Sequence, residues 1–150
     1  MSCFTTGVTV VTAHTQGQDW GMTCNSFNTV SLDPAMVLWS VRKTSASHEA
    51  FVTAGGYMVN VLGAQQKDVA LKFAQGTQAE RFADQPLVRG IHHHPRLDGV
   101  IAWFDCRIAQ VVSAGDHDIL IGEVLDFGVH AGHGLAYAQR SFGVLAPMED

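Results

Sequence analysis

Four consecutive small polar side chains interrupt a segment that otherwise carries apolar residues; they are Thr23, Cys24, Asn25 and Ser26. Hydroxyl and amide groups in such a run, together with the backbone, can hydrogen-bond the edge of a planar heteroaromatic ligand. The same run would equally suit the exposed polar edge of a strand. Both interpretations stay open on the residues alone, and for Cys24 we expect a buried, inert thiol.

A second polar cluster follows the apolar run that ends at Val41. Arg42 and Lys43 come first, and hydroxyl residues and His48 follow at the expected start of a helix. Free N–H groups at a helix start attract anions, and Arg and Lys add charge-assisted hydrogen bonds. The pattern predicts a phosphate site; an ordinary capped helix with solvated basic residues is the alternative.

The sequence Gly-Asp-His-Asp at residues 115–118 separates two long apolar segments. Gly115 and Asp116 are typical of a two-residue hairpin turn, which accounts for the glycine and the acids. It does not account for His117, because a histidine at a strand start can face a pocket, stack on a ring or donate a hydrogen bond. We therefore predict a turn with a functional histidine beside it.

Three adjacent histidines, His92, His93 and His94, raise the question of a metal site. Neighbouring residues of an extended chain point to opposite faces, so three in a row converge on one metal only where the chain bends. No cysteine or carboxylate lies nearby at a recognisable ligand spacing. We predict no metal site, and a metal-dependent enzyme built on these histidines is the alternative.

The composition describes one globular domain over residues 1–150 and limits its partners. Hydrophobic residues make up 47% of the chain and charged residues 15%, which is typical of a folded protein. The formal net charge of -5 and the lack of basic clusters argue against nucleic acid. The sequence shows no membrane-spanning run and no signal peptide pattern. Three cysteines without close spacing predict reduced thiols and a cytoplasmic protein.

These groups must be positioned by a fold that is mostly strands. Runs rich in β-branched residues predict strands over 7–12, 36–41, 57–62, 99–113 and 119–129, and a last segment over 134–145. Residues 20–31 are predicted to be extended but irregular, and 84–95 to be rich in turns. Short helices are predicted over 45–53, with Ser45 or Ser47 as the cap, and over 65–74. The pattern indicates a mostly antiparallel β-barrel or sandwich.

Taken in order, several of these stretches resemble one family, the flavin reductase-like, FMN-binding split-barrel domain. The matching stretches are TTGVTVVTA (5–13), GMTCNSFNTVSLDPAMVLWSVRKTSASHEAF (21–51), YMVNVLGAQQKDVALKFA (57–74), GVIAWFDCRIAQVVSAGDHDILIGEV (99–124) and YAQRSFGVL (137–145). Together they cover nearly the whole chain. The family comprises the small reductase components of two-component flavin-dependent monooxygenases.

The resemblance implies a fold, an activity and partners. It implies a mostly β Greek-key split β-barrel with two or three short helices, assembled as a homodimer. The implied activity is hydride transfer from NADH or NADPH to FMN, with FAD possible as the flavin. The reduced flavin would serve a partner monooxygenase. An FMN-binding electron-transfer or sensor module without turnover is the alternative.

The resemblance also implies roles for single residues. Thr23, Cys24, Asn25 and Ser26 should line the isoalloxazine ring. Ser40, Val41, Arg42, Lys43 and Ser45 should hold the ribityl chain and phosphate, with His48 nearby. Asp116 and His117 match the motif that receives the nicotinamide and are the expected catalytic residues. Tyr137, Arg140 and Phe142 match a C-terminal segment that closes over the flavin. The helix that usually precedes the family's first strand is missing from this sequence.

Overall fold

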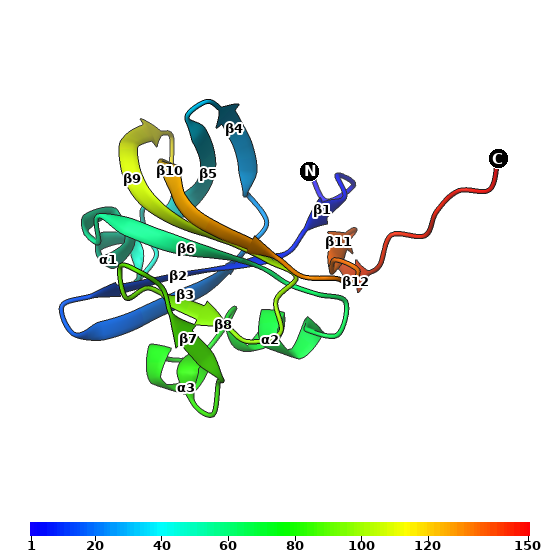
Figure 1. The fold of residues 1–150 in the computed structure, drawn as a ribbon, viewed down its shortest axis with the longest axis horizontal. Coiled ribbons are helices and arrows are strands. Elements are labelled where there is room, and N and C mark those ends of the chain that lie inside the picture. Colours follow the sequence, from blue (N-terminus) through cyan, green and yellow to red (C-terminus); the bar gives the residue numbers. More distant parts are fainter.

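The computed structural model describes residues 1–150. A strongly curved, antiparallel seven-stranded sheet forms a barrel (Figure 1), with the strand order β3-β2-β6-β9-β10-β5-β4. The strands of this sheet are β2 (Thr9–Thr15), β3 (Gln18–Cys24), β4 (Asn28–Leu32), β5 (Ala35–Arg42), β6 (Gly56–Val61), β9 (Ala102–Ala114) and β10 (His117–Val129). The order departs from chain order at β2–β6 and β10–β5, as the expected Greek-key connections require.

Smaller elements surround the barrel. A three-stranded sheet contains β1 (Thr6–Gly7), β11 (Ala136–Ala138) and β12 (Ser141–Gly143), and a two-stranded hairpin contains β7 (Leu87–Arg89) and β8 (Pro95–Leu97). The three helices are α1 (His48–Thr53), α2 (Lys67–Lys72) and α3 (Gln78–Phe82). No helix is long and apolar enough to cross a membrane.

Strand β6 lies between two hydrophobic clusters and supplies side chains to both. Because successive side chains of a strand point to opposite faces, Tyr57 enters one cluster and Met58 the other. In the first cluster the ring of Trp39 meets those of Phe51 and Tyr57 edge to face. The second cluster packs α2 against the barrel through Phe73. The first cluster also contains Cys24 and Val41, so buried packing holds the ends of β3 and β5 in place.

A tight turn closes the hairpin of β9 and β10. Ala114 pairs with His117, so Gly115 and Asp116 form the two-residue turn that the sequence predicts. Of these two residues only Gly115 has a positive φ, 62°, as the first position of a type II′ turn requires. The turn places His117 at the first position of β10.

Several elements differ from the sequence prediction. Residues 20–31, expected to be irregular, form most of β3 and β4 with a break at residues 25–27. Helix α3 and the β7–β8 hairpin lie in segments for which neither a helix nor a strand was predicted. Ser47 is the N-cap residue of α1, but its side chain makes no capping hydrogen bond. Its backbone N–H instead donates to Ser45 Oγ at 3.2 Å.

Candidate cofactor site

A pocket of about 550 Å³ opens where β3, β5 and β10 meet at one end of the barrel. It is called the hydroxyl pocket here and is lined by Met22, Thr23, Cys24, Asn25, Ser26, Ser40, Arg42, Thr44, Ser45 and His117. Residues far apart in the sequence meet because β10 pairs with β5, which sets His117 directly opposite Arg42. The side chains of such a cross-strand pair lie on the same face.

Ser26 joins the loop after β3 to strand β5. The backbone N–H of Ser40 donates to Ser26 Oγ at 3.0 Å, and Cys24 Sγ lies 3.0 Å from the same hydroxyl. Strands β3 and β5 are not neighbours in the sheet, so this contact bridges the gap between them. The Ser26 side chain therefore shapes the pocket wall and has little hydrogen-bonding capacity left for a ligand.

Cys24 lies in the pocket wall as a nearly buried thiol. Burial raises the pKa of this thiol, and the hydrogen bonds from Ser26 only partly oppose the effect. A thiol is a poor nucleophile, because the reactive form is the thiolate. The burial and the raised pKa agree with the expectation of an inert cysteine. Cys24 contributes its backbone groups and its volume to the pocket wall.

The polar groups of the pocket divide into those that already have a partner and those that do not. Thr23 Oγ1 donates to the carbonyl of Ala70 at 2.5 Å, which ties the end of β3 to helix α2. The side chains without a partner in the chain are Asn25, Ser40, Arg42 and Thr44. One amide, two hydroxyls and one guanidinium therefore remain free to bind a ligand.

His117 stands at the rim of this pocket with one ring nitrogen engaged. Its Nδ1 lies 2.7 Å from Asp116 Oδ1, which leaves Nε2 free. The hydrogen bond from His117 holds the pKa of the exposed Asp116 carboxyl below its ordinary value. The backbone N–H of Lys43 donates to the carbonyl of Asp116 at 2.9 Å, so the turn is fastened to the end of β5. The histidine is thus oriented by its own turn.

A second pocket, of about 410 Å³, shares the wall formed by residues 23–25. It is called the apolar pocket and is lined by Val8, Thr23, Cys24, Asn25, Ala70, Leu71, Ala74, Tyr137, Arg140 and Phe142. The rings of Tyr137 and Phe142 lie 5.1 Å apart and belong to the paired strands β11 and β12. One short backbone segment therefore separates a polar, cationic pocket from an apolar one.

Most of the predicted site residues line one of these two pockets. Thr23, Cys24, Asn25, Ser26, Ser40, Arg42, Ser45 and His117 line the hydroxyl pocket, and Tyr137, Arg140 and Phe142 line the apolar pocket. Asp116 adjoins through its bond with His117. Besides Asp116, three predicted residues line neither pocket; they are Val41, Lys43 and His48.

The three residues outside the lining have other surroundings. Val41 is fully buried in the first cluster. The ammonium of Lys43 donates to Ser113 Oγ at 2.5 Å. His48 Nε2 lies 2.6 Å from a carboxylate oxygen of Asp118, a contact between residues 70 positions apart. Val41 can offer only its backbone groups to a ligand, whereas the Lys43 ammonium keeps further N–H donors besides the one bonded to Ser113. The predicted roles of all three residues stay untested.

Sequence reasoning missed several residues of the lining. Thr44 stands within the predicted phosphate cluster, so its hydroxyl was within reach of the same argument. Met22, the α2 residues Ala70 and Leu71, and Ala74 just after α2 carry no chemical group that marks them. Their role comes from the packing of α2 beside β3, which no local pattern reveals.

The donor set and the shape of the two pockets fit a flavin nucleotide. Arg42 and the hydroxyls suit a phosphate and a polyol chain, because each offers donors that a phosphate or hydroxyl oxygen accepts. Asn25 is exposed at the wall between the pockets and can hydrogen-bond the polar edge of a ring. The apolar pocket offers the flat hydrocarbon surface that a ring system needs.

Comparisons with known proteins identify the family of the chain. The profile of the family described as "Flavin reductase like domain" matches residues 1–146. The reductase component of the flavin-dependent trigonelline monooxygenase of Acinetobacter baylyi is 45% identical over 93% of this chain, which spans 45% of that protein. The FMN reductase (NADH) SmoA of Agrobacterium fabrum is 42% identical over 95% of this chain and 81% of its own length.

A solved structure gives the same result for the fold. The NADH:FAD oxidoreductase SgcE6 of Streptomyces globisporus, in complex with NAD and FAD fragments, superposes with a TM-score of 0.92 and 34% identity. The superposition covers 99% of this chain and 90% of that one. The profile match covers nearly the whole chain and the barrel is shared. The chain belongs to the flavin reductase-like domain family.

Proposed function

We propose that this domain is an NAD(P)H-dependent flavin reductase that uses FMN or FAD and supplies reduced flavin to a partner monooxygenase. The observation that carries the proposal is the pair of pockets on either side of residues 23–25, one with a free guanidinium and hydroxyls and one apolar. The names of the related reductase components support the same reaction. The chain spans 45% of the length of the related Acinetobacter baylyi reductase component. The activity and the partner of the whole protein are therefore proposed for this chain.

The residues of the chain act by binding and orienting. A bound flavin supplies the hydride acceptor of the reaction. Arg42, Ser40 and Thr44 hold the phosphate end, and Asn25 hydrogen-bonds the edge of the ring. His117, oriented by Asp116, faces the nicotinamide. Tyr137 and Phe142 exclude water from the ring faces, because hydride transfer depends on close, dry contact more than on a strong acid or base.

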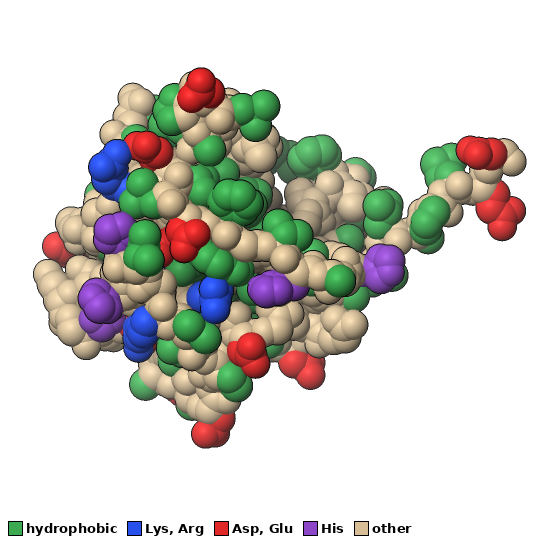
Figure 2. Space-filling model, viewed as in Figure 1, with side chains coloured by type: hydrophobic (Ala, Val, Ile, Leu, Met, Phe, Trp, Pro, Cys, Tyr) green, Lys and Arg blue, Asp and Glu red, His purple; other side chains and the backbone are tan.

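We also infer that the domain works as a homodimer in the cytoplasm. Exposed apolar side chains on the edge strand β4 and near the end of β10 support a second copy as their occupant: Leu32 on β4 is 94% exposed, and Phe127 and Val129 on β10 are 64% and 72% exposed. Figure 2 shows apolar side chains exposed between few charged ones on the face in view. Light scattering on the purified chain should give twice the monomer mass. A monomer at micromolar concentration would contradict this part of the proposal.

Steady-state kinetics with each flavin and each nicotinamide test the reaction itself. We expect oxidation of NADH or NADPH that depends on added flavin and continues for many turnovers. The purified protein should be yellow or become yellow when flavin is added. If the protein retains FMN through gel filtration but never oxidises either nicotinamide, the proposal is wrong and the electron-transfer or sensor module takes its place.

A further inference from the structure

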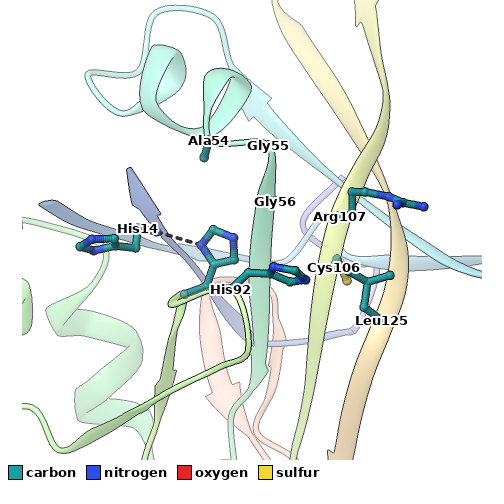
Figure 3. A pocket seen from close by; sticks show the side chains of 9 residues that line it. His14, Ala54, Gly55, Gly56, His92, Cys106, Arg107 and Leu125 are labelled. Atoms are coloured by element: carbon teal, nitrogen blue, oxygen red, sulfur yellow. Dashed lines mark hydrogen bonds between the residues drawn. The ribbon is translucent and has the colours of Figure 1, made fainter. Parts of the chain in front are cut away.

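The opposite end of the β2–β3 hairpin carries a separate pocket of about 320 Å³ (Figure 3). It is called the histidine pocket and is lined by His14, Ala54, Gly55, Gly56, His92, His94, Cys106, Arg107 and Leu125. In the hairpin register Thr9 pairs with Cys24 whereas His14 pairs with Asp19. At about 3.4 Å per residue, the two ends lie roughly 17 Å apart. The histidine pocket shares no residue with the hydroxyl or apolar pocket.

The structure fixes the tautomer of His94. Its Nδ1 accepts a hydrogen bond from the backbone N–H of His14 at 2.9 Å, the bond that Figure 3 marks with a dashed line. Burial, together with the charges of neighbouring histidines, lowers the pKa of His94 to about 4, so the ring is neutral at pH 7. A neutral ring whose Nδ1 accepts must carry its proton on Nε2. His94 therefore presents one N–H donor of fixed direction.

That donor has no acceptor in the chain. The side chain belongs to a residue that is only 4% exposed, and it lines the pocket. Gly56 permits this arrangement, because a Cβ at Gly56 would lie 2.8 Å from Nε2 and 2.5 Å from the carbonyl oxygen of Cys106. A nearly buried N–H donor that faces a cavity without a partner favours an acceptor ligand.

The loop that carries the histidines is held in place by ion pairs on its outer side. Arg89 of β7 donates to both carboxylate oxygens of Asp19 at 2.5 and 2.7 Å, and His14 Nδ1 lies 2.7 Å from the same carboxylate. This bidentate ion pair holds the β7–β8 hairpin against β3. His92 and His94 therefore enter the pocket from a loop that is anchored at its base.

The rest of the lining is largely apolar. Leu125 is the extra residue of a β-bulge in β10, between the pairs Val124–Cys106 and Asp126–Asp105. A bulge re-aims a side chain, and here Leu125 lines the pocket. The guanidinium of Arg107 donates to Glu123 at 2.5 Å and points away from the histidines in Figure 3, so its stem is what lines the wall.

A metal does not suit these groups. Both nitrogens of His94 are committed, Nδ1 as an acceptor and Nε2 as a donor, and a metal ligand needs a nitrogen without a proton. No group of three or more histidine, cysteine or acidic side chains is placed to hold a metal ion. The groups available are imidazole N–H donors.

We propose that the histidine pocket binds a small carboxylate with an apolar body. The Nε2–H of His94 and the imidazole N–H of His92 donate to the two carboxylate oxygens. Ala54, Leu125 and the stem of Arg107 contact the apolar part. The site is independent of the proposed flavin reduction, because it lies at the other end of the hairpin.

Benzoate is the probe, with benzamide as its neutral isostere and inorganic phosphate as an anion without an apolar body. Calorimetry on the full chain should show benzoate binding at least tenfold more tightly than either. The His94 Nε2–H resonance in a ¹⁵N-histidine spectrum should shift during the titration. Binding should be unchanged within about twofold when the protein is saturated with FMN.

Two variants separate the donor from the structural role of the ring. In His94→Asn, Oδ1 can still accept from the His14 N–H, but the donor at Nε2 is lost; we expect at least tenfold weaker benzoate binding at an unchanged melting temperature. In His94→Gln the amide N–H can replace the donor, and part of the affinity should return. NADH oxidation should stay the same in both variants.

Three outcomes would overturn this proposal. One is equal affinity for benzoate and benzamide, and another is full benzoate affinity in a folded His94→Asn variant. The third is displacement of benzoate by FMN, which would place the ligand in the hydroxyl or apolar pocket. None of these depends on whether the protein turns over NADH, so failure of the reductase proposal would be recognised separately.

Discussion

The two ends of the β2–β3 hairpin present opposite kinds of chemistry. At the end near Cys24 the pocket is lined mainly by hydroxyls and one amide, and its ionisable side chains are Cys24, Arg42 and His117. At the other end His14, Asp19, Arg89 and His94 are joined by hydrogen bonds and ion pairs. The pKa of His94 falls to about 4 there. The pKa of Asp19 lies below its ordinary value, because the bonds from Arg89 and His14 outweigh the effect of burial.

This contrast shows what shifted pKa values do and do not reveal. Strongly perturbed groups often mark catalytic sites, because acid–base chemistry needs tuned protons. A site for hydride transfer needs positioned surfaces instead, so it can be built from groups that do not titrate. Here the groups with shifted pKa values near the hydroxyl pocket are the Cys24 thiol and the exposed Asp116 carboxyl, whereas the ligand-binding groups without a partner on Asn25, Ser40 and Thr44 do not titrate.

The largest expected effect belongs to the one free cation of the hydroxyl pocket. Arg42→Ala should raise the Kd for FMN about 10- to 100-fold, since hydrogen bonds to charged groups contribute about 1.5–3 kcal/mol. Quenching of flavin fluorescence measures the change. Lys43→Ala is the matched control, because its ammonium is bonded to Ser113; its Kd should stay within about threefold. If both variants lose the same FMN affinity, binding depends on the number of positive charges and not on the position of Arg42.

His117 should separate the two substrates. We expect His117→Ala to lower kcat/KM for the nicotinamide about tenfold, because a misplaced ring lengthens the path of the hydride. The Kd for FMN should remain within about threefold. Asp116→Asn, which removes the charged partner of the ring, should give a smaller loss of kcat/KM in the same assay. If His117→Ala weakens FMN binding to the same extent as it lowers kcat/KM, His117 does not act specifically on the nicotinamide.

A third test concerns stability at the histidine end. Asp105 on β9 is fully buried, and neither carboxylate oxygen has a hydrogen-bond partner. Burial raises its pKa, while the charge of His92 acts in the opposite direction. The folded protein therefore holds this proton at pH values where the unfolded chain has lost it, and stability falls as the pH rises through that window.

Asp105→Asn removes this pH dependence. The variant should be more stable than the parent at pH 8 by about 1 kcal/mol, and the gain should vanish at about pH 2.5, where Asp105 is protonated in both states. Urea denaturation at both pH values measures the difference. Asp98→Asn, at an exposed carboxylate, is the control and should change little. A gain of the same size at both pH values would show that charge is not the cause.

The smallest effect is expected from the exposed histidines. A double variant with His92→Ala and His93→Ala should keep NADH oxidation within about twofold, because neither side chain lies near the hydroxyl pocket. Metal analysis of the untagged protein belongs with this experiment. Loss of activity in the variant, together with a stoichiometric metal in the parent, would revive the metal-dependent alternative.

The features that the sequence predicted well rest on local patterns. Gly115 and Asp116 define a hairpin turn by themselves, so the position of His117 at the start of β10 followed directly. The β-branched runs predicted the long strands for the same reason. Helix α3 was missed, although Thr77 accepts from the backbone N–H of Glu80 and the two form the S/T-x-x-E pattern of a helix start. The signal was present but only five residues of helix follow it.

The features that the sequence could not predict depend on contacts between distant residues. The contact of His48 with Asp118 joins α1 to β10 and engages one ring nitrogen of the histidine, whose predicted place near the phosphate stays a prediction. The apolar pocket needs α2 to lie beside β3, and the alanines that line it look like ordinary core residues. Residue types identified the chemistry of the site, but only the packing of the barrel shows which groups share a wall.

Residues 23–25 form that wall, and Thr23 is fastened to α2 through both its hydroxyl and its backbone N–H. The flavin proposed for this site reaches both faces of the segment, because its phosphate end belongs to the hydroxyl pocket and its ring to the apolar pocket. We therefore expect the position of this wall relative to α2 to set the affinity for the whole flavin nucleotide and not for one end of it.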